Sequence, residues 1–425
     1  MTASTPPAAA PAADIPRAGA PAQRREGSGR PGLTGGLLVV LGLLSAIAPF
    51  AIDLYLPAFP LMRQELGTTA TAVQLTLTAF LVGVAAGQLV FGPLSDRFGR
   101  RVPLVVGALL CVAASAATVL APTVEALVAA RFVQGLSGAA GMVIGRAVVS
   151  DLATGRAAAR AFSLMMIVGG VAPVVAPVVG SLLLRPLGWR GLLGVVLFLA
   201  VVMLVSVLVV VRESHPRECR TGRGGVRPPG SGRSGLGSRA YLGNTVAFTF
   251  GFAVLMAYIS ASPFLYQAMM GLGETQYGLL FGLNALALAV VSGISGKLTA
   301  TRSVTGLLRT GLVTVLAATV VLAVLVATGT PAGWYGVPVF VAVAGLGLVL
   351  GNATALALAA VPDAAGVASA VLGAAQFALA GAVSPLVGLG GDSTAAPLAA
   401  VMVVAAVLAL VGQVAAGRRP RVAGG

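Results

Sequence analysis

The stretch GQLVFGPLSDRFGRRVPLVVG, residues 87–107, places a knot of charge between two apolar runs. The charged side chains are Asp96, Arg97, Arg100 and Arg101, in a chain with 9% charged and 57% hydrophobic residues. Soluble domains carry about 25% charged residues, so this composition indicates a membrane protein. The knot therefore marks a short polar turn between two membrane spans.

The apolar runs are long enough to cross a bilayer, which requires about 20 residues each. Backbone amides cannot stay unpaired in lipid, and the alternating pattern of barrel strands is absent, so the runs predict helices. The prediction is an all-α membrane protein with twelve spans, at residues 36–57, 73–94, 102–121, 125–148, 161–184, 191–211, 241–268, 276–297, 305–328, 334–358, 366–388 and 394–416.

Two polar stretches organise the chain. Residues 1–34 are rich in Ala, Pro and Arg and lack the apolar core of a signal peptide, so they predict a disordered cytoplasmic tail. The Gly-, Pro- and Arg-rich residues 212–240 predict a cytoplasmic linker loop. The remaining divisions are a six-helix bundle at 35–211, a second at 241–417 and a short cytoplasmic tail at 418–425.

The basic residues predict the orientation in the membrane. With the amino terminus inside, they fall in cytoplasmic segments apart from Arg63, Arg185 and Arg190 outside and Arg131 and Arg146 within a span. This positive-inside bias predicts a multi-pass protein of the inner or plasma membrane with both termini cytoplasmic. The net charge of +15 does not indicate nucleic-acid binding, because the arginines scatter over short loops without interleaved aromatics.

Enzyme chemistry and metal binding have few candidate residues. Cys111 lies in a span, whereas Cys219 and the single histidine, His215, lie in the linker, so we expect no disulfide, metal or cofactor. The segment GISGKLT from Gly293 lacks the spacing of a phosphate-binding loop. An enzyme is therefore not expected.

The two halves resemble each other, as in transporters built from internal repeats. SAIAPFAID from Ser45 resembles ISASPFLYQ from Ile259, and PVVG from Pro177 resembles PLVG from Pro385. The matching order of these segments predicts two pseudo-symmetric bundles.

The charged turn has a structural use as well as a topological one. Asp96 can accept hydrogen bonds from a helix amino terminus, and the arginines can pair with acids such as Asp151. The alternative is that the arginines only set topology. We predict a conformational clasp on the cytoplasmic side, formed by Gly92, Asp96, Arg97, Gly99, Arg100, Arg101, Arg146 and Asp151.

The pattern G-x-L-x-D-R-x-G-R-R between two spans resembles the signature loop of the major facilitator superfamily. DLYLPAFP from Asp53, RFVQGLSGAAGMVIGRAVVSD from Arg131 and ASPFLYQ from Ala261 are similar to segments of the Bcr/CflA drug-resistance transporters. The resemblance covers nearly all of residues 40–416. It implies a major facilitator fold and a drug:proton antiporter that works by alternating access.

Asp53 and Arg131 are charges at membrane depth. Each costs several kcal/mol there, so both should face a cavity or each other. Burial disfavours the charged carboxylate and a nearby arginine favours it, so an arriving substrate can tip the balance. The resemblance implies that this pair couples transport to protons. The alternative is a permanent ion pair that only fixes packing.

A small-residue face occurs in the fifth span, where close helix approach is expected. It resembles the packing motif associated with antiporters of the superfamily, and plain packing is the alternative. Its members follow helical spacing: Gly169, Ala172, Pro173, Ala176, Pro177 and Gly180.

Uncharged polar and aromatic residues are candidates for a mostly apolar substrate cavity. They are Tyr55, Gln74, Gln88, Gln134, Tyr258, Tyr266, Gln267, Asn284, Asn352 and Gln376. Such a cavity suits a small amphipathic drug-like substrate, with the lipid bilayer as the other partner and a monomeric chain. An exporter of an endogenous metabolite, such as an amino acid or a self-made antibiotic, and a passive facilitator are the alternatives.

Overall fold

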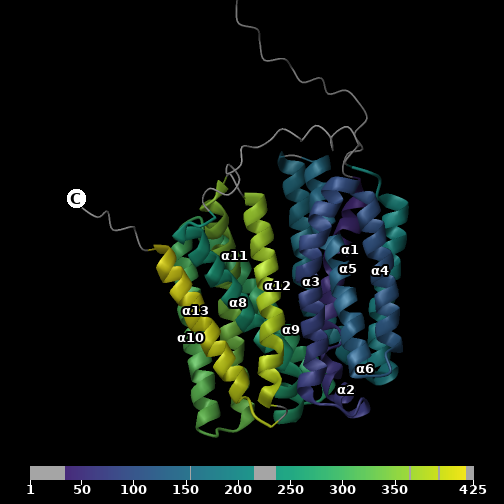
Figure 1. Cartoon of the computed structure of the whole chain (residues 1–425). Helices are drawn as coiled ribbons and strands as arrows, with labels where there is room; N and C mark the ends of the chain where they lie inside the picture. The colour runs from purple at the N-terminus through teal and green to yellow at the C-terminus, as the bar shows by residue number, and fades with distance from the viewer. Residues whose placement is uncertain (1–33, 154, 215–235, 363–364, 391–392, 418–425) are drawn as a thin grey trace, which may run out of the picture.

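The computed structural model describes residues 34–153, 155–214, 236–362, 365–390 and 393–417 (Figure 1). The first half contains α1 (Gly35–Asp53), η1 (Leu56–Ala58), α2 (Phe59–Glu65), α3 (Ala70–Phe98), α4 (Arg101–Leu120), α5 (Val124–Leu152) and α6 (Gly155–Val210). The second half contains α8 (Arg239–Pro263), η2 (Phe264–Met269), α9 (Glu274–Leu298), α10 (Val304–Ala327), η3 (Ala332–Tyr335), α11 (Gly336–Ala359), α12 (Ala365–Val387), η5 (Gly388–Gly390) and α13 (Ala396–Gly417).

Within the described residues, 11 helical segments are long and apolar enough to cross a membrane. One of them, Val171–Val210, has 40 residues, which as a straight helix would span about 60 Å, twice the hydrocarbon thickness of roughly 30 Å. The helix is broken at Gly188, where φ is 65° and ψ is 178°. The all-α membrane fold is confirmed, and the count of twelve spans depends on counting the two arms of α6 separately.

The first predicted span, 36–57, lies within the membrane segment Gly35–Glu65, but its helix is interrupted near its end. Helix α1 stops at Asp53, and the chain continues through η1 and the short α2. Pro57 and Pro60 lack the backbone N–H that a continuous helix would use, so the LPAFP segment forms short helical turns instead. The break leaves Asp53 at a helix end.

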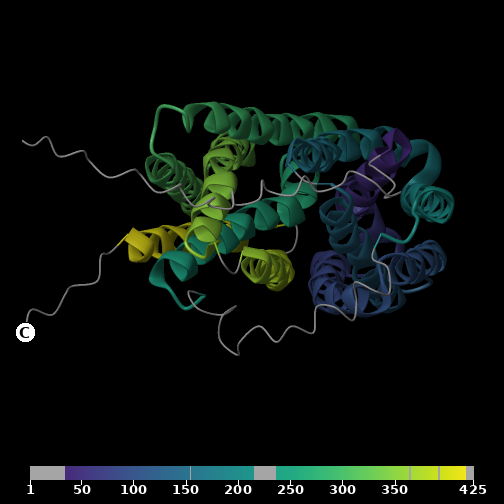
Figure 2. The ribbon, with the colours of Figure 1, turned by 90° about the horizontal axis from the view of Figure 1, so that it is seen from above.

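Helix pairings in the first half recur in the second. The pairs α4–α5, α4–α6 and α1–α6 correspond to α10–α11, α10–α13 and α8–α13. The two groups lie side by side (Figures 1 and 2) and meet where α3 packs on α12 and α6 packs on α9. Large exposed apolar side chains such as Val39, Leu120 and Val209 occur on the outer surface, as expected where lipid is the solvent.

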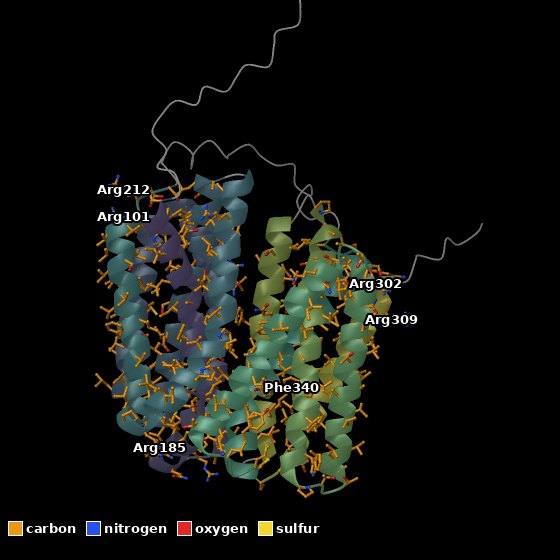
Figure 3. All side chains as sticks on the ribbon, turned by 180° about the vertical axis from the view of Figure 1, so that it is seen from behind. Arg101, Arg185, Arg212, Arg302, Arg309 and Phe340 are labelled. Atoms are coloured by element: carbon orange, nitrogen blue, oxygen red, sulfur yellow. The ribbon has the colours of Figure 1, made fainter. Side chains whose placement is uncertain are left out.

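The two ends of the bundle differ in charge. Helix α1 begins and α13 ends at the same end, which we name the termini end; the opposite end is the far end (Figure 1). Arg101, Arg212 and Arg302 lie toward the termini end, whereas Arg185 lies at the far end (Figure 3). This distribution agrees with the asymmetry expected from the sequence.

Helices α3 and α5 approach closely because glycines face backbone. A Cβ atom on Gly135 would collide with the carbonyl oxygen of Phe80, whereas a Cβ on Gly138 of the same helix would meet nothing within 4 Å. Backbone cannot rotate away as a flexible side chain can, so an added methyl group forces the helices apart.

We therefore expect Gly135→Ala to destabilise the protein by about 1–3 kcal/mol, the usual cost of overpacking. Gly138→Ala is the matched control and should be neutral. Thermal unfolding of the two purified variants measures the difference. Equal melting temperatures would show that the α3–α5 crossing tolerates the extra atom.

Candidate functional site

Asp53 is a buried carboxylate, one oxygen of which is unpaired among the described residues. Its side chain is 2% exposed, and among the described residues its Oδ1 atom has no hydrogen-bond partner. A buried charge without compensation is costly, so the site favours either a protonated carboxyl or a bound cation. The Oδ1 atom of Asp53 therefore contributes no hydrogen bond to the described structure.

The side chain of Asp53 lies on the wall of a cavity of about 210 Å³ between the two halves. The wall is mostly apolar and aromatic. Its lining residues are Ala48, Pro49, Ile52, Asp53, Met142, Pro173, Phe252, Leu255, Met256, Tyr258, Ile259, Phe281, Ala285, Leu288, Val343, Gln376 and Phe377.

Hydrogen bonds between the halves lie toward the far end. Arg185 Nε donates to Glu274 Oε2 at 2.9 Å, and Gln267 Nε2 donates to the Pro57 carbonyl at 3.0 Å. Gln74 Nε2 also donates to the Ser260 carbonyl at 3.0 Å. These contacts hold the halves together on the far side of the cavity.

Arg131 is fully buried within the first half. Its Nη1 donates to Gln134 Oε1 and its Nη2 to the Ala51 carbonyl, both at 2.7 Å. The guanidinium carbon lies 4.3 Å from the ring centroid of Tyr55 and 4.5 Å from that of Phe80. Neutral acceptors and ring faces therefore stabilise the cation.

The expected alternative of a fixed Asp53–Arg131 ion pair does not occur among the described contacts. Arg131 binds the backbone of α1 at Ala51, whereas the Asp53 side chain lies on the cavity wall. Arg131 therefore contacts the backbone of α1 rather than the Asp53 carboxylate.

Most of the chain matches a known protein family. The model of the Major Facilitator Superfamily matches residues 41–385. The chain belongs to this superfamily. Uncharacterized MFS-type transporter YdgK of Bacillus subtilis is 36% identical to this transporter, covering 88% of this chain and 93% of YdgK. The bicyclomycin resistance protein homolog of Haemophilus influenzae is 30% identical, covering 85% and 91% of the two chains. The expected resemblance to drug-resistance transporters of the superfamily is thereby confirmed.

A solved structure gives the same fold. The bacterial homolog of the human lysosomal transporter Spinster, in its inward-facing and occupied conformation, superposes with a TM-score of 0.69 at 15% identity. The match covers 89% of this transporter and 95% of that chain. Such low identity supports the multi-pass helical fold alone.

The charged clasp of the transporter centres on Arg100, whose side chain is 6% exposed. Its Nη1 contacts Asp96 Oδ1 at 2.6 Å and its Nε contacts Asp151 Oδ2 at 2.8 Å. Burial lowers the pKa of Arg100, but hydrogen bonds and attraction from Asp151 and Asp96 outweigh it and raise the pKa above its ordinary value. At Gly99, which ends α3, φ is 91°, a conformation that favours glycine.

Other predicted members of the clasp lie apart from this ion-pair cluster. Arg97 stacks over Phe98 at 5.5 Å, and Gly92 faces Val143. Arg146 was predicted to contact Asp151 or the charged turn, but neither contact occurs among the described residues; its Nε donates to the Met142 carbonyl of its own helix at 3.0 Å. Asp151 pairs with Arg100 instead.

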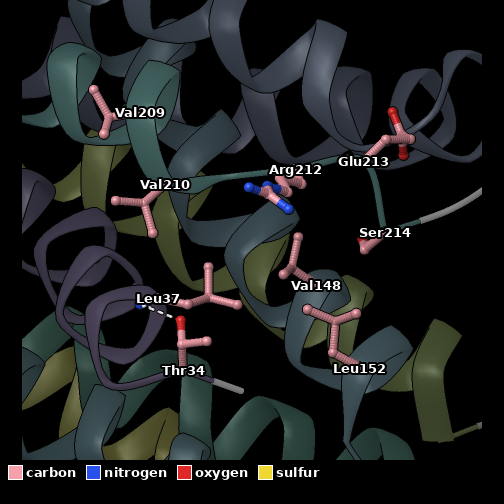
Figure 4. Close-up of a pocket in the computed structure, with 9 residues that line it drawn as sticks. All are labelled: Thr34, Leu37, Val148, Leu152, Val209, Val210, Arg212, Glu213 and Ser214. Carbon is pink, nitrogen blue, oxygen red and sulfur yellow. Dashed lines mark hydrogen bonds between the residues drawn. The ribbon is translucent and has the colours of Figure 1, made fainter. Parts of the chain in front are cut away.

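Glu213 was not identified from the sequence, yet it caps α4. Its carboxylate accepts from the backbone N–H of Arg100 at 2.9 Å and of Arg101 at 3.2 Å. Glu213 therefore takes the capping role that was predicted for Asp96. It follows α6 and lies far from α4 in the sequence. Glu213 also lines a second cavity of about 290 Å³, between α1, α5 and the end of α6 (Figure 4). His215 and Cys219 lie outside the described residues.

We expect Glu213→Gln to destabilise the transporter by about 0.5–2 kcal/mol, the range for losing a helix cap. The amide oxygen can accept from one N–H group, but the amide nitrogen cannot accept from the other. Thermal unfolding measures the loss. Arg212→Gln changes the neighbouring exposed charge and should unfold as wild type; an equal loss there would assign the effect to the segment rather than to the cap.

The small-residue face of α6 packs between the halves. Ala172 and Ala176 are buried, and a Cβ atom on Gly180 would collide with the Leu54 carbonyl oxygen. Pro173 lines the cavity, whereas Pro177 lies near Gly278 of α9. Gly169 belongs to the same helix but is not among the residues whose surroundings the structure describes. The face therefore contacts Leu54, which follows Asp53, and α9 of the second half.

Two of the predicted polar cavity residues, Tyr258 and Gln376, line the cavity. Asn284 stands behind Tyr258 and donates to the hydroxyls of Tyr258 and Tyr266, both at 2.9 Å. The others lie in helix–helix contacts: Gln74 and Gln267 between the halves, Gln88 beside Gly373, Asn352 against Ser295, and Tyr55 and Gln134 around Arg131. Sequence position alone did not separate these two groups.

Proposed function

We propose that this transporter exports small amphipathic drugs in exchange for protons. The observation that carries the proposal is Asp53, a buried carboxylate on the wall of the cavity between the halves, whose Oδ1 atom has no hydrogen-bond partner among the described residues. A site that cannot hold a charge without cost binds a proton when empty and releases it when a ligand or water compensates the carboxylate. That property is what proton-coupled exchange requires.

The contacts between the halves support a cycle of alternating access. The far-end contacts Arg185–Glu274, Gln267–Pro57 and Gln74–Ser260 must break for the cavity to open toward that end. With the termini end facing the cytoplasm, the described state takes up substrate from inside the cell. A proton from outside the cell enters in the alternative state, which opens toward the far end. The chain needs no second copy for this cycle.

Relatives support the drug-export part of the proposal. One of them is named a bicyclomycin resistance protein homolog, and others are named chloramphenicol resistance protein and multidrug resistance protein MdtL. Their names concern those proteins, and the mostly apolar wall of the cavity is compatible with amphipathic compounds.

The test is growth of an efflux-deficient host expressing the transporter on a panel of antibiotics, followed by export assays in everted membrane vesicles with and without a protonophore. Protection that the protonophore removes is the expected result. Export that persists without a proton gradient would indicate a passive facilitator. Absence of protection and of export for the whole panel would favour a metabolite exporter.

A further inference from the structure

A second cavity lies at the termini end, apart from the cavity that contains Asp53 (Figure 4). It has a volume of about 290 Å³ and lies where α1 begins and where α5 and α6 end. Its lining residues are Thr34, Leu37, Val148, Leu152, Val209, Val210, Arg212, Glu213 and Ser214. None of these residues lines the cavity between the halves, so the second cavity has no part in the proposed exchange.

The wall of this second cavity joins the lipid-facing surface. Val209 on the wall is 76% exposed and belongs to the apolar outer surface of α6. Leu37 of α1 and Val148 of α5 are buried, so the cavity leads from that surface into the space between the helix ends. An apolar depression that is open to lipid is better filled by hydrocarbon than by water.

Arg212 is the one basic residue in the lining, and within the described part of the chain no ion pair involves it. The acid of the lining, Glu213, already accepts from the backbone N–H groups of Arg100 and Arg101. Arg101 brings a second guanidinium to this corner (Figure 3), because its Nη2 donates to the carbonyl of Leu208, one helical turn before Arg212, at 3.4 Å. The corner therefore presents positive charge beside an apolar wall.

We propose that this cavity binds the headgroup region of an anionic phospholipid. The phosphate binds Arg212, whose guanidinium matches the geometry of a phosphate group. Thr34 accepts from the backbone N–H of Leu37 at 3.3 Å through its Oγ1 atom, so its hydroxyl hydrogen can donate to the same phosphate. The glycerol and the first methylene groups pack against Val209 and Val210.

The size and position of the cavity fit this ligand. Its volume of about 290 Å³ is near the lower end of the range of small-molecule sites, roughly 300–1,000 Å³, so the acyl chains remain in the bilayer. Basic pockets between helices at the membrane surface attract anionic headgroups. The lipid contacts α1, α5 and α6, so its binding should stabilise the folded transporter, whichever substrate is exported.

The experiment uses the purified full-length transporter in a neutral detergent. The lipid probes are phosphatidylglycerol, which is anionic, and phosphatidylcholine with the same acyl chains, which is neutral overall; inorganic phosphate tests a free anion. Native mass spectrometry counts the lipids retained during a titration, and thermal unfolding measures the stabilisation. We expect phosphatidylglycerol to raise the melting temperature of the wild type more than phosphatidylcholine does, and inorganic phosphate at equal concentration to leave it unchanged.

Arg212→Gln should weaken the binding of phosphatidylglycerol at least about fivefold, the effect of one basic residue at an anionic membrane surface. Arg212→Lys should keep most of the affinity, because an ammonium group also binds phosphate as a point charge. The matched control is Arg302→Gln, which removes an exposed arginine at the same end but outside the cavity and should bind the lipid as the wild type does. Without phosphatidylglycerol, all three variants should unfold as the wild type does, which shows that they are folded.

Equal phosphatidylglycerol affinity in Arg212→Gln and Arg302→Gln would overturn the inference. Equal stabilisation by phosphatidylcholine would remove the requirement for an anionic headgroup, and equal stabilisation by inorganic phosphate would assign the site to a free anion rather than to a lipid. Each of these outcomes contradicts the proposal, whereas none of them bears on export through the cavity at Asp53.

Discussion

Replacing Asp53 with asparagine is expected to abolish uphill export while leaving membrane insertion intact. The amide has nearly the same shape as the carboxyl group but cannot exchange a proton. Because Asp53 Oδ1 has no described hydrogen-bond partner, the substitution removes no contact from that atom. Substrate accumulation in everted vesicles under an imposed proton gradient measures the loss, with the amount of inserted protein quantified in the same membranes.

Glu125→Gln provides the control, because Glu125 is exposed in the first turn of α5. This variant should export at the wild-type rate. If Asp53→Asn also exports against a gradient at that rate, proton coupling resides in another group.

Arg131→Lys is expected to lose both stability and transport. A lysine ammonium cannot reproduce the planar arrangement in which Arg131 reaches Gln134 and the Ala51 carbonyl between two rings. Breaking a buried charged network costs about 3–5 kcal/mol when partners are left unsatisfied. The melting temperature and the initial rate of export should both fall.

The matched variant is Arg146→Lys on the same helix, where among the described residues the arginine side chain donates to the carbonyl of its own Met142. It should resemble the wild type in both measurements. Equal behaviour of the two lysine variants would mean that Arg131 fills space without organising the site.

Hydropathy predicted the spans because the hydrocarbon core of a bilayer requires about 20 consecutive, mostly apolar residues in each helix. Thr34, Thr69 and Thr123 cap α1, α3 and α5 through their side-chain oxygens, a start signal that the span prediction did not use. The end of α1 at Asp53 was not predicted. Two prolines three residues apart interrupt the helix there without making the segment less apolar.

The candidate site was predictable where a residue type was rare at membrane depth. Asp53 stood out as an acid within an apolar run, and Arg131 as its basic counterpart. Their separation by the backbone of α1 depends on helix rotation, which spacing along the chain does not determine. Glu213 escaped notice because it begins a polar stretch in which acids are ordinary, although folding brings it to the α4 amino terminus.

Infrared difference spectroscopy tests most directly whether Asp53 takes up and releases a proton. The carbonyl stretch of a protonated carboxyl group would be followed in the reconstituted transporter between acidic and alkaline pH, and on adding a transported substrate. We expect the wild type to show a band that both alkaline pH and substrate remove and that Asp53→Asn lacks. A band that is identical in the wild type and in Asp53→Asn, or one that substrate leaves unchanged, would contradict the exchange of substrate and proton at Asp53.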